Sequence, residues 1–123
     1  METNKITEMI IGCAIEVHKF LGPGLLESAY EECLVFELKK LGLIVERQKP
    51  VRVVCKDVKL DCGYRVDILV ENKVVIELKV VDTFNPVHEA QILTYMKFAN
   101  KKIGLLLNFN VTALKNGIKR FVL

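Results

Sequence analysis

Residues 63–79 restrict the possible folds of this chain more than any other stretch. Two runs of alternating side chains flank the polar break Glu71-Asn72-Lys73, which is the pattern of a β-hairpin. A three-residue turn would give one wholly apolar face, built from the facing pairs Val70–Val74, Ile68–Ile76, Val66–Leu78 and Tyr64–Val80. A two-residue turn would mix charged and apolar side chains on both faces. Because burial of one face selects the register strongly, we expect the three-residue turn.

The opposite face of the predicted hairpin carries charge. It places Asp67 opposite Glu77 and Arg65 opposite Lys79. Like charges that face each other across a ladder repel, whereas two carboxylates with water and a substrate phosphate are ligands that suit Mg²⁺. Two interpretations follow: the charged face is a divalent-cation site, or it is a solvated strand face with unrelated charges. The hairpin residues alone support both.

The composition agrees with a single domain spanning residues 1–123. With 123 residues, 51% of them hydrophobic, the chain is long enough for one well-filled core and too short for two domains. The net charge of +3 is compatible with a phosphate-bearing partner without requiring one. The chain lacks a run of about 18 apolar residues, and its first residues lack the pattern of a signal peptide, so we expect a cytoplasmic protein.

The four cysteines form no recognisable ligand or disulfide pattern. Cys13, Cys33, Cys55 and Cys62 show neither CxxC spacing nor an accompanying pair of histidines. We expect buried thiols in a reducing cytoplasm, and neither a zinc site nor a disulfide framework.

The chain is expected to open with a helix. Apolar residues recur at intervals of three and four from Ile6 to Leu21, which predicts a helix with one buried face. Thr3 or Asn4 is available as its N-cap, and Gly22-Pro23-Gly24 ends it.

A second helix is predicted from Leu26 to Leu41. Its apolar stripe consists of Leu26, Tyr30, Leu34, Leu38 and Leu41. Gly42 follows as the natural residue after the C-cap. Glu27 lies in the first turn, where a carboxylate complements the positive end of the helix dipole. From this stretch alone, we prefer that structural role for Glu27.

Strand and helix signals alternate in the rest of the chain. Residues 45–55 alternate loosely around Pro50 and predict an outer strand, because proline cannot donate to a ladder. Lys56-Asp57 is expected to turn the chain toward the hairpin. Asn85-Pro86 predicts the N-cap and first residue of a third helix that ends near Ala99.

The third helix and the residues after it complete the expected fold. His88, Gln91 and Tyr95 share one face of that helix. The continuous apolar run 103–107 predicts a strand covered on both sides, and residues 118–121 predict a short basic edge strand. The order is therefore α-α-β-β-β-α-β plus a short C-terminal strand, which predicts an α/β (α+β) fold with a mixed β-sheet flanked by helices.

Several of these residues together match a known pattern. Asp67, the run Glu77-Leu78-Lys79 and the run 91–95 resemble the D…ExK…QxxxY motif of the PD-(D/E)XK nuclease superfamily, in particular its RecB-like exonuclease branch. Each motif alone is weak, but together they occur in the right order and on the expected elements. The usual proline before the aspartate is Val66 here, a departure that is common in that branch.

A further motif narrows the resemblance. Residues 24–30 match GxxExxY, the motif after which a small family within the superfamily is named. The resemblance covers nearly the whole chain, from the first helix to Phe121. It implies a single nuclease-like domain with a restriction-endonuclease-like core.

The resemblance also implies catalytic roles. Asp67 and Glu77 would hold one or two Mg²⁺ or Mn²⁺ ions, together with the backbone carbonyl of Leu78. Lys79 would orient or help to deprotonate the attacking water and would offset charge in the transition state.

Four other residues receive roles from the same resemblance. Glu27 resembles a first-helix acid that touches a metal directly or through water, and His18 is an alternative donor on the neighbouring helix. A lone histidine is nevertheless more often a structural hydrogen-bonding residue. Gln91 and Tyr95 would line the cleft and position the scissile phosphate or a ligating residue.

Two hypotheses about function follow. The first is a metal-dependent nuclease that hydrolyses phosphodiester bonds of nucleic acid, with DNA as the expected substrate and with low sequence specificity. The second is a non-catalytic nuclease-fold module that binds nucleic acid or a protein partner. The motifs leave open DNA versus RNA and endonuclease versus exonuclease cleavage.

Other surfaces suggest partners. A basic rim for phosphates could be formed by Lys97, Lys101, Lys102, Lys115, Lys119 and Arg120. We expect no membrane partner. An outer strand around residues 51–54 could pair with a second copy, which makes a homodimer possible.

Overall fold

The computed structural model describes residues 1–60 and 62–123. Within them the elements follow one another as α1 (Thr3–Leu21), α2 (Glu27–Lys40), β1 (Val45–Pro50), β2 (Val53–Cys55), β3 (Val58–Leu60), β4 (Arg65–Val70), β5 (Val74–Lys79), α3 (Pro86–Ala99), β6 (Ile103–Asn108), the 3-10 helix η1 (Leu114–Gly117) and β7 (Ile118–Val122). Strands β1-β4-β5-β6-β7 form one sheet in that order, in which β5 and β6 run parallel and the other neighbours antiparallel. This mixed sheet with helices packed against it confirms the predicted α+β architecture.

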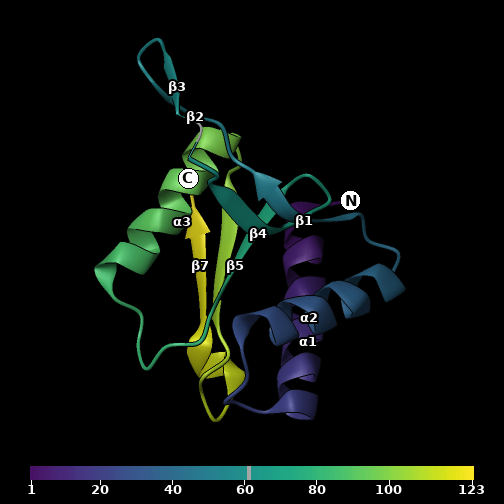
Figure 1. The fold of residues 1–123 in the computed structure, drawn as a ribbon. Helices are drawn as coiled ribbons and strands as arrows, with labels where there is room; N and C mark the ends of the chain where they lie inside the picture. The colour runs from purple at the N-terminus through teal and green to yellow at the C-terminus, as the bar shows by residue number, and fades with distance from the viewer. Residues whose placement is uncertain (61) are drawn as a thin grey trace.

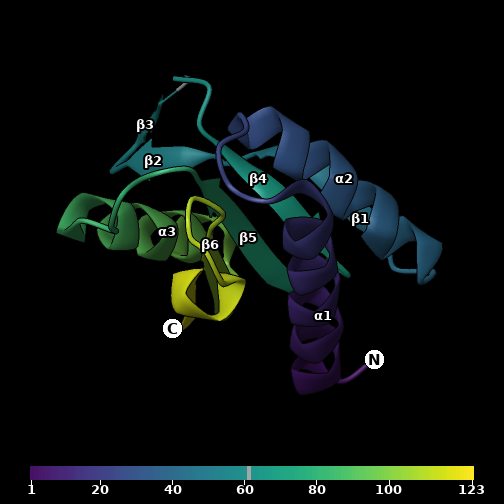
Figure 2. The same ribbon diagram turned by 90° about the horizontal axis from the view of Figure 1, so that it is seen from below.

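The sheet lies between two layers of helices. Helices α1 and α2 cover one face and α3 covers the other (Figure 1; Figure 2). Each central strand therefore faces apolar surroundings on both sides, and successive residues of β6 are apolar for that reason. Leu105 and Leu107 belong to the core under α1 and α2, whereas Leu106 belongs to the core under α3. This confirms the prediction for residues 103–107.

The register of the central hairpin is the one predicted. Strands β4 and β5 pair as Val70–Val74, Leu69–Val75 and Ile68–Ile76, across a three-residue turn. The pairing of these two strands stops there, so four further expected pairs are not formed: Val66–Leu78, Tyr64–Val80, Asp67–Glu77 and Arg65–Lys79. Val66 packs under α3, while Leu78 packs under α1 and α2. Strand β4 therefore separates from β5 at residue 67.

The helix ends follow local capping chemistry. Asn85 caps α3 through hydrogen bonds from the backbone N–H groups of Val87 and His88, with Pro86 as the first helical residue, as predicted. Gly42 follows α2 with a φ of +82°, and its N–H donates to the carbonyl of Lys39. These caps confirm the predicted end of α2 and start of α3.

Two expectations for the first two helices were wrong. The N-cap of α1 is Glu2, not Thr3 or Asn4, because the N–H of Ile6 already donates to the Glu2 carbonyl. Leu26 and Leu41 do not belong to the buried stripe of α2. They are its N-cap and C-cap, and they are 78% and 51% exposed.

The expected strand over residues 45–55 is divided in two. Strand β1 is one of the two outer strands of the sheet, and its pairing with β4 ends where the N–H of Val51 donates to the carbonyl of Tyr64 at 2.8 Å. The chain then leaves the sheet, and β2 pairs with β3 as a separate hairpin that turns at Lys56-Asp57. This hairpin projects from the body of the molecule (Figure 1).

The cysteines differ from the prediction in their burial. All four are free thiols, but Cys13 alone among them is buried, Cys33 is half-buried, and Cys55 and Cys62 are exposed. Cys55 is exposed because it lies on the projecting hairpin. In the described part of the chain, none of the helices combines the length and apolar character needed to cross a bilayer.

Candidate functional site

The candidate site lies where β4 and β5 separate. The backbone N–H of Leu78 donates to Oδ2 of Asp67 at 2.8 Å. The Asp67 carboxylate thus accepts a hydrogen bond from the Leu78 backbone at the point where main-chain pairing between β4 and β5 has ended. Asp67 is held in place by this bond and lies beside Glu77.

Glu77 is buried in an unusual state. The residue is 4% exposed, and its Oε1 atom has no hydrogen-bond partner in the described structure. The pKa of Glu77 is raised to about 10, mainly by burial and further by the charge of Asp67 and a hydrogen bond between the two carboxyl groups. The charge of Lys79 opposes this rise without cancelling it. The metal-free protein therefore holds Glu77 protonated at neutral pH.

These two carboxyl groups fit a divalent cation. A buried acceptor without a partner is costly in a folded protein, as is a pair of adjacent carboxylates. A cation between them would give Glu77 Oε1 a partner and would favour the ionised form of both acids. Hard divalent ions such as Mg²⁺ prefer oxygen ligands of this kind. No group of three or more His, Cys, Asp or Glu side chains suited to a metal occurs among residues 1–60 and 62–123.

A polar chain leads from β5 to α3. Lys79 Nζ donates to Oε1 of Gln91 at 3.3 Å, and Gln91 Nε2 donates to the hydroxyl of Tyr95 at 3.2 Å. Gln91 and Tyr95 are one helical turn apart, so they share the face of α3 that covers the sheet. Lys79 and Glu77 are two residues apart and lie on that same face of β5. The structure thus brings all three side chains of this polar chain to the α3 side of the sheet.

A second tyrosine lies beside this chain. The rings of Tyr64 and Tyr95 are tilted, with their centroids 6.1 Å apart. Burial raises the pKa of Tyr95, the hydrogen bond with Gln91 opposes the rise, and the charges of Glu77, Tyr64 and Asp67 add to it. Both tyrosines line a small hollow of about 330 Å³ whose wall is mainly apolar. Tyr95 is therefore close enough to Glu77 and Asp67 for their charges to affect its pKa, and Tyr64 lines the same hollow as Tyr95.

An asparagine on β6 fixes the backbone segment that follows β5. Asn108 lies opposite Lys79 in the parallel ladder between β5 and β6 and is 3% exposed. Its Oδ1 accepts hydrogen bonds from the N–H groups of Val81 and Asn110, and its Nδ2 donates to the Val81 carbonyl at 2.8 Å. Asn108 thus fixes the backbone two residues after Lys79 against the neighbouring strand. A polar residue at the end of the buried run 103–107 was a signal that the sequence analysis left unused.

Helix α2 supports Asp67 through the edge strand. Gln48 Nε2 donates to Glu31 Oε1 at 2.7 Å and lies 3.5 Å from Asp67 Oδ1. Glu31 is 8% exposed and also accepts two hydrogen bonds from the Arg47 guanidinium, at 2.9 and 3.2 Å. This relay is not predicted by the sequence patterns described above. Its one local signal is that Glu31 follows Tyr30 on the buried side of a helix, where an unpaired carboxylate is rare.

Glu27 and His18 are placed differently from Asp67 and Glu77. Glu27 is exposed in the first turn of α2, and it does not join the two acids as a third metal-binding carboxylate in the described structure. His18 is 6% exposed, and its Nε2 lies 2.7 Å from the carbonyl of Val111. His18 therefore ties α1 to the loop after β6.

The GxxExxY motif shapes the connection between α1 and α2. The Tyr30 hydroxyl donates to the Gly22 carbonyl at 2.6 Å and accepts from the N–H of Leu25 at 3.1 Å. Its ring stacks on Phe109 at a centroid distance of 4.5 Å. Gly24 has a φ of +97°, a conformation that side-chain-bearing residues rarely adopt. The glycine and the tyrosine of the motif thus have structural roles.

Comparison with known proteins agrees with this geometry. A family model described as the PD-(D/E)XK nuclease superfamily matches residues 4–121. The chain belongs to the PD-(D/E)XK nuclease superfamily. The helices and the mixed five-stranded sheet are accordingly its restriction-endonuclease-like core. Neither the curated proteins nor the solved structures that were compared include a match to this chain.

Proposed function

We propose that this member of the PD-(D/E)XK superfamily is a metal-dependent nuclease that hydrolyses phosphodiester bonds of DNA with low sequence specificity. We place it in the GxxExxY family, close to the RecB-like exonucleases. The observation that carries the proposal is the buried, unpartnered Oε1 of Glu77 next to the Asp67 carboxylate, with Lys79 on the same strand face. A buried acceptor without a partner beside a second carboxyl group is costly in the metal-free protein, and such arrangements are concentrated at functional sites.

Asp67 and Glu77 are the residues that would hold Mg²⁺ or Mn²⁺. When bound, such an ion supplies Lewis-acid polarisation of the phosphate and a more acidic water nucleophile. Asp67 is preorganised for this role by the Leu78 N–H, and Glu77 is preorganised by the apolar surroundings that keep water away from it. Glu27 is exposed in the first turn of α2, and the role we propose for it is to complement the helix dipole.

Lys79, Gln91 and Tyr95 would position the reacting groups. The Lys79 ammonium is held by Gln91 at 3.3 Å, which aims it along the face that carries the two acids. There it would orient the attacking water and stabilise the charge that develops on the phosphoryl oxygens. Gln91 and Tyr95 would hold the nucleic-acid strand next to the scissile bond, because both side chains reach the site from α3.

Purified protein is expected to hydrolyse DNA only when a divalent ion is present. The measurement is gel analysis of labelled single-stranded and duplex DNA, and of RNA of the same sequence, with Mg²⁺ or Mn²⁺ and with a chelator. Chelation should abolish product formation. A wild type that stays inert on every substrate with both metals would replace the proposal with that of a non-catalytic binding module.

Glu27→Gln tests the role of the first-turn acid. As a complement to the helix dipole, Glu27 contributes a few tenths to about 1 kcal/mol of stability, and its loss should leave cleavage unchanged. We expect this outcome because Glu27 is exposed and does not join Asp67 and Glu77 as a ligand group. Thermal melting with and without Mn²⁺, beside the cleavage assay, measures both effects. A weaker Mn²⁺-dependent shift in Tm together with slower cleavage would instead make Glu27 a metal or water ligand.

A further inference from the structure

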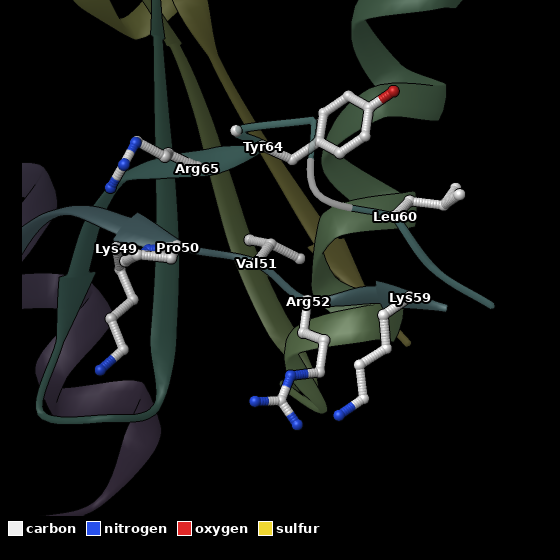
Figure 3. A pocket seen from close by; sticks show the side chains of 9 residues that line it. Lys49, Pro50, Val51, Arg52, Lys59, Leu60, Tyr64 and Arg65 are labelled. Carbon is white, nitrogen blue, oxygen red and sulfur yellow. The ribbon is translucent and has the colours of Figure 1, made fainter. Parts of the chain in front are cut away.

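A basic hollow of about 580 Å³ lies between the end of β1, the β2–β3 hairpin and the start of β4. Four cationic side chains line it: Lys49, Arg52, Lys59 and Arg65 (Figure 3). In the described part of the chain, the wall of this basic hollow contains no carboxylate. It is separate from the basic rim that the sequence suggested near the C-terminus.

Two of the four cations have partners on β1. Lys49 Nζ forms an ion pair with Glu46 Oε2 at 2.7 Å. Arg65 Nη1 donates to the backbone carbonyl of Gln48 at 3.1 Å, which orients its guanidinium without neutralising it. Counted over the described residues of its wall and their ion-pair partner Glu46, the basic hollow therefore has a net positive charge.

Arg52 and Lys59 repel each other on the hairpin. Lys59 pairs with Val54, and Arg52 precedes Val54 by two residues, so both long side chains lie on the same side of the two strands. Figure 3 shows them extending side by side in one direction. Neither forms an ion pair with any residue in the described ranges 1–60 and 62–123. A bound anion would turn this repulsion into a favourable contact.

The basic hollow adjoins the proposed site. Arg65 precedes Asp67 by two residues on β4, and Tyr64 lines both the basic hollow and the smaller hollow next to Gln91 and Tyr95. A linear polyanion that lies across Tyr64 would reach the two acids at one end and the cations at the other. Since carboxylates repel a phosphate, cations nearby help to retain the polyanion.

The hairpin is anchored at its base and free at its tip. Val51, at the base, is 6% exposed and packs in the core under α3. Strands β2 and β3 pair with each other and not with the five-stranded sheet. Two-stranded hairpins are marginally stable alone, so this one depends on its base and on what it contacts.

We infer that the basic hollow binds the phosphodiester backbone of a nucleic-acid strand beside the Asp67–Glu77 site, with Arg52 and Lys59 on the hairpin as the main phosphate contacts. The hairpin is an arm that holds the polynucleotide while an adjoining phosphate lies at the two acids. The placement of the strand over the acids rests on the proposed function, whereas the phosphate contacts do not. The contacts are to the backbone and are therefore independent of base sequence.

The test compares two double variants of equal charge. In Arg52→Ala/Lys59→Ala the basic hollow loses the two cations that form no ion pair within the described ranges 1–60 and 62–123. In the control, Lys5→Ala/Lys39→Ala, two exposed lysines are removed from α1 and α2. Fluorescence anisotropy of labelled single-stranded DNA, duplex DNA and RNA is measured with a chelator present, over a range of salt concentrations, so that no cleavage is needed.

The hollow variant is expected to bind nucleic acid roughly tenfold more weakly, and the slope of log affinity against log salt should fall by about 1.5 to 2. The control should change neither value by more than the general effect of net charge. The three oligonucleotides distinguish DNA from RNA as the source of the phosphates. An equal loss in both double variants, or an unchanged salt slope in the hollow variant, would overturn the inference.

Further measurements distinguish a loss of phosphate contacts from misfolding of the variant, and a failure of this inference from a failure of the proposed nuclease activity. Arg52→Gln/Lys59→Gln keeps most of the aliphatic packing, and it should weaken binding as much as the alanine variant with an unchanged Tm. If wild type binds but does not cleave, the proposed nuclease activity fails and the phosphate contacts stand. If it cleaves and the hollow variant shows an unchanged KM, the activity stands and the inference fails. Binding of polyglutamate but of none of the nucleic acids would also overturn it.

Discussion

Lys79→Ala is expected to lower the rate of DNA cleavage by roughly 10²–10⁴-fold while metal binding persists. The lysine is proposed to act on the attacking water and on transition-state charge, so its loss removes stabilisation that the ground state does not use. Glu77→Ala should lose metal binding and cleavage together, because Glu77 supplies the buried acceptor that a cation would satisfy. This dissociation between the two variants is the most informative result.

Calorimetric titration with Mn²⁺, run beside single-turnover cleavage, measures the dissociation. Lys73→Ala is the matched control, because Lys73 lies in the turn of the same hairpin and contacts the Met1 carbonyl instead of the acids. It should keep both properties. A contaminating nuclease would give equal activity in all preparations. Loss of Mn²⁺ binding in Lys79→Ala equal to that in Glu77→Ala would remove the distinct role proposed for the lysine.

The metal-free protein is expected to lose stability as pH rises, and Glu77→Gln should remove that loss. The pKa of Glu77 is about 10 in the folded chain against an ordinary value of 4.5, so between these values the folded state holds one more proton than the unfolded state. The stabilisation is complete below pH 4.5 and is lost as pH rises through about 10. At about 1.36 kcal/mol per pH unit, the contribution between pH 5 and 8 has an upper limit of about 4 kcal/mol.

Urea unfolding of wild type and Glu77→Gln in a chelator, at several pH values from 5 to 8, tests this expectation. Glutamine keeps the shape of the side chain but does not ionise, so the variant should gain in unfolding free energy relative to wild type as pH rises. Adding Mn²⁺ should stabilise wild type by about 2.7 kcal/mol at one hundred times the dissociation constant, and the variant by much less. Parallel pH profiles for the two proteins would show that Glu77 is not held protonated by the fold.

The stability cost and the proposed activity have the same origin. Burial of Glu77 under α3 raises its pKa, and the same burial would keep water from competing for a cation. Asp67 is held by the Leu78 N–H at one oxygen and by the relay from Glu31 through Gln48 at the other. A site that destabilises the empty protein in this way is typical of a functional centre.

Much of the local structure could be predicted from short-range rules. The register of the central hairpin follows from burial of one face, because a slip of one residue would expose its valines and isoleucines. The start of α3 follows from the Asn85 side chain and the fixed φ of Pro86. The motif residues Glu77, Lys79, Gln91 and Tyr95 could be named because their spacing is local, and the structure places them on neighbouring elements.

The fold alone decided how these elements interact. Separation of β4 from β5 at Asp67 depends on Val66 packing under α3 and not beside Leu78, which no alternation pattern encodes. The relay from Glu31 joins a helix to an edge strand 17 residues away, through a residue with a positive φ at Gln48.

The basic hollow and the state of Glu77 are likewise tertiary properties. Arg52 and Arg65 stand before and after the hairpin in the sequence, and they line one hollow because the hairpin between them folds back on itself. A Glu-x-Lys triplet is ordinary on a solvated strand. Here α3 buries the glutamate and the neighbouring strand brings Asp67 beside it, and both effects raise its pKa. Desolvation and the distances between charges depend on the whole fold, which is why periodicity and spacing could identify these residues but not their protonation.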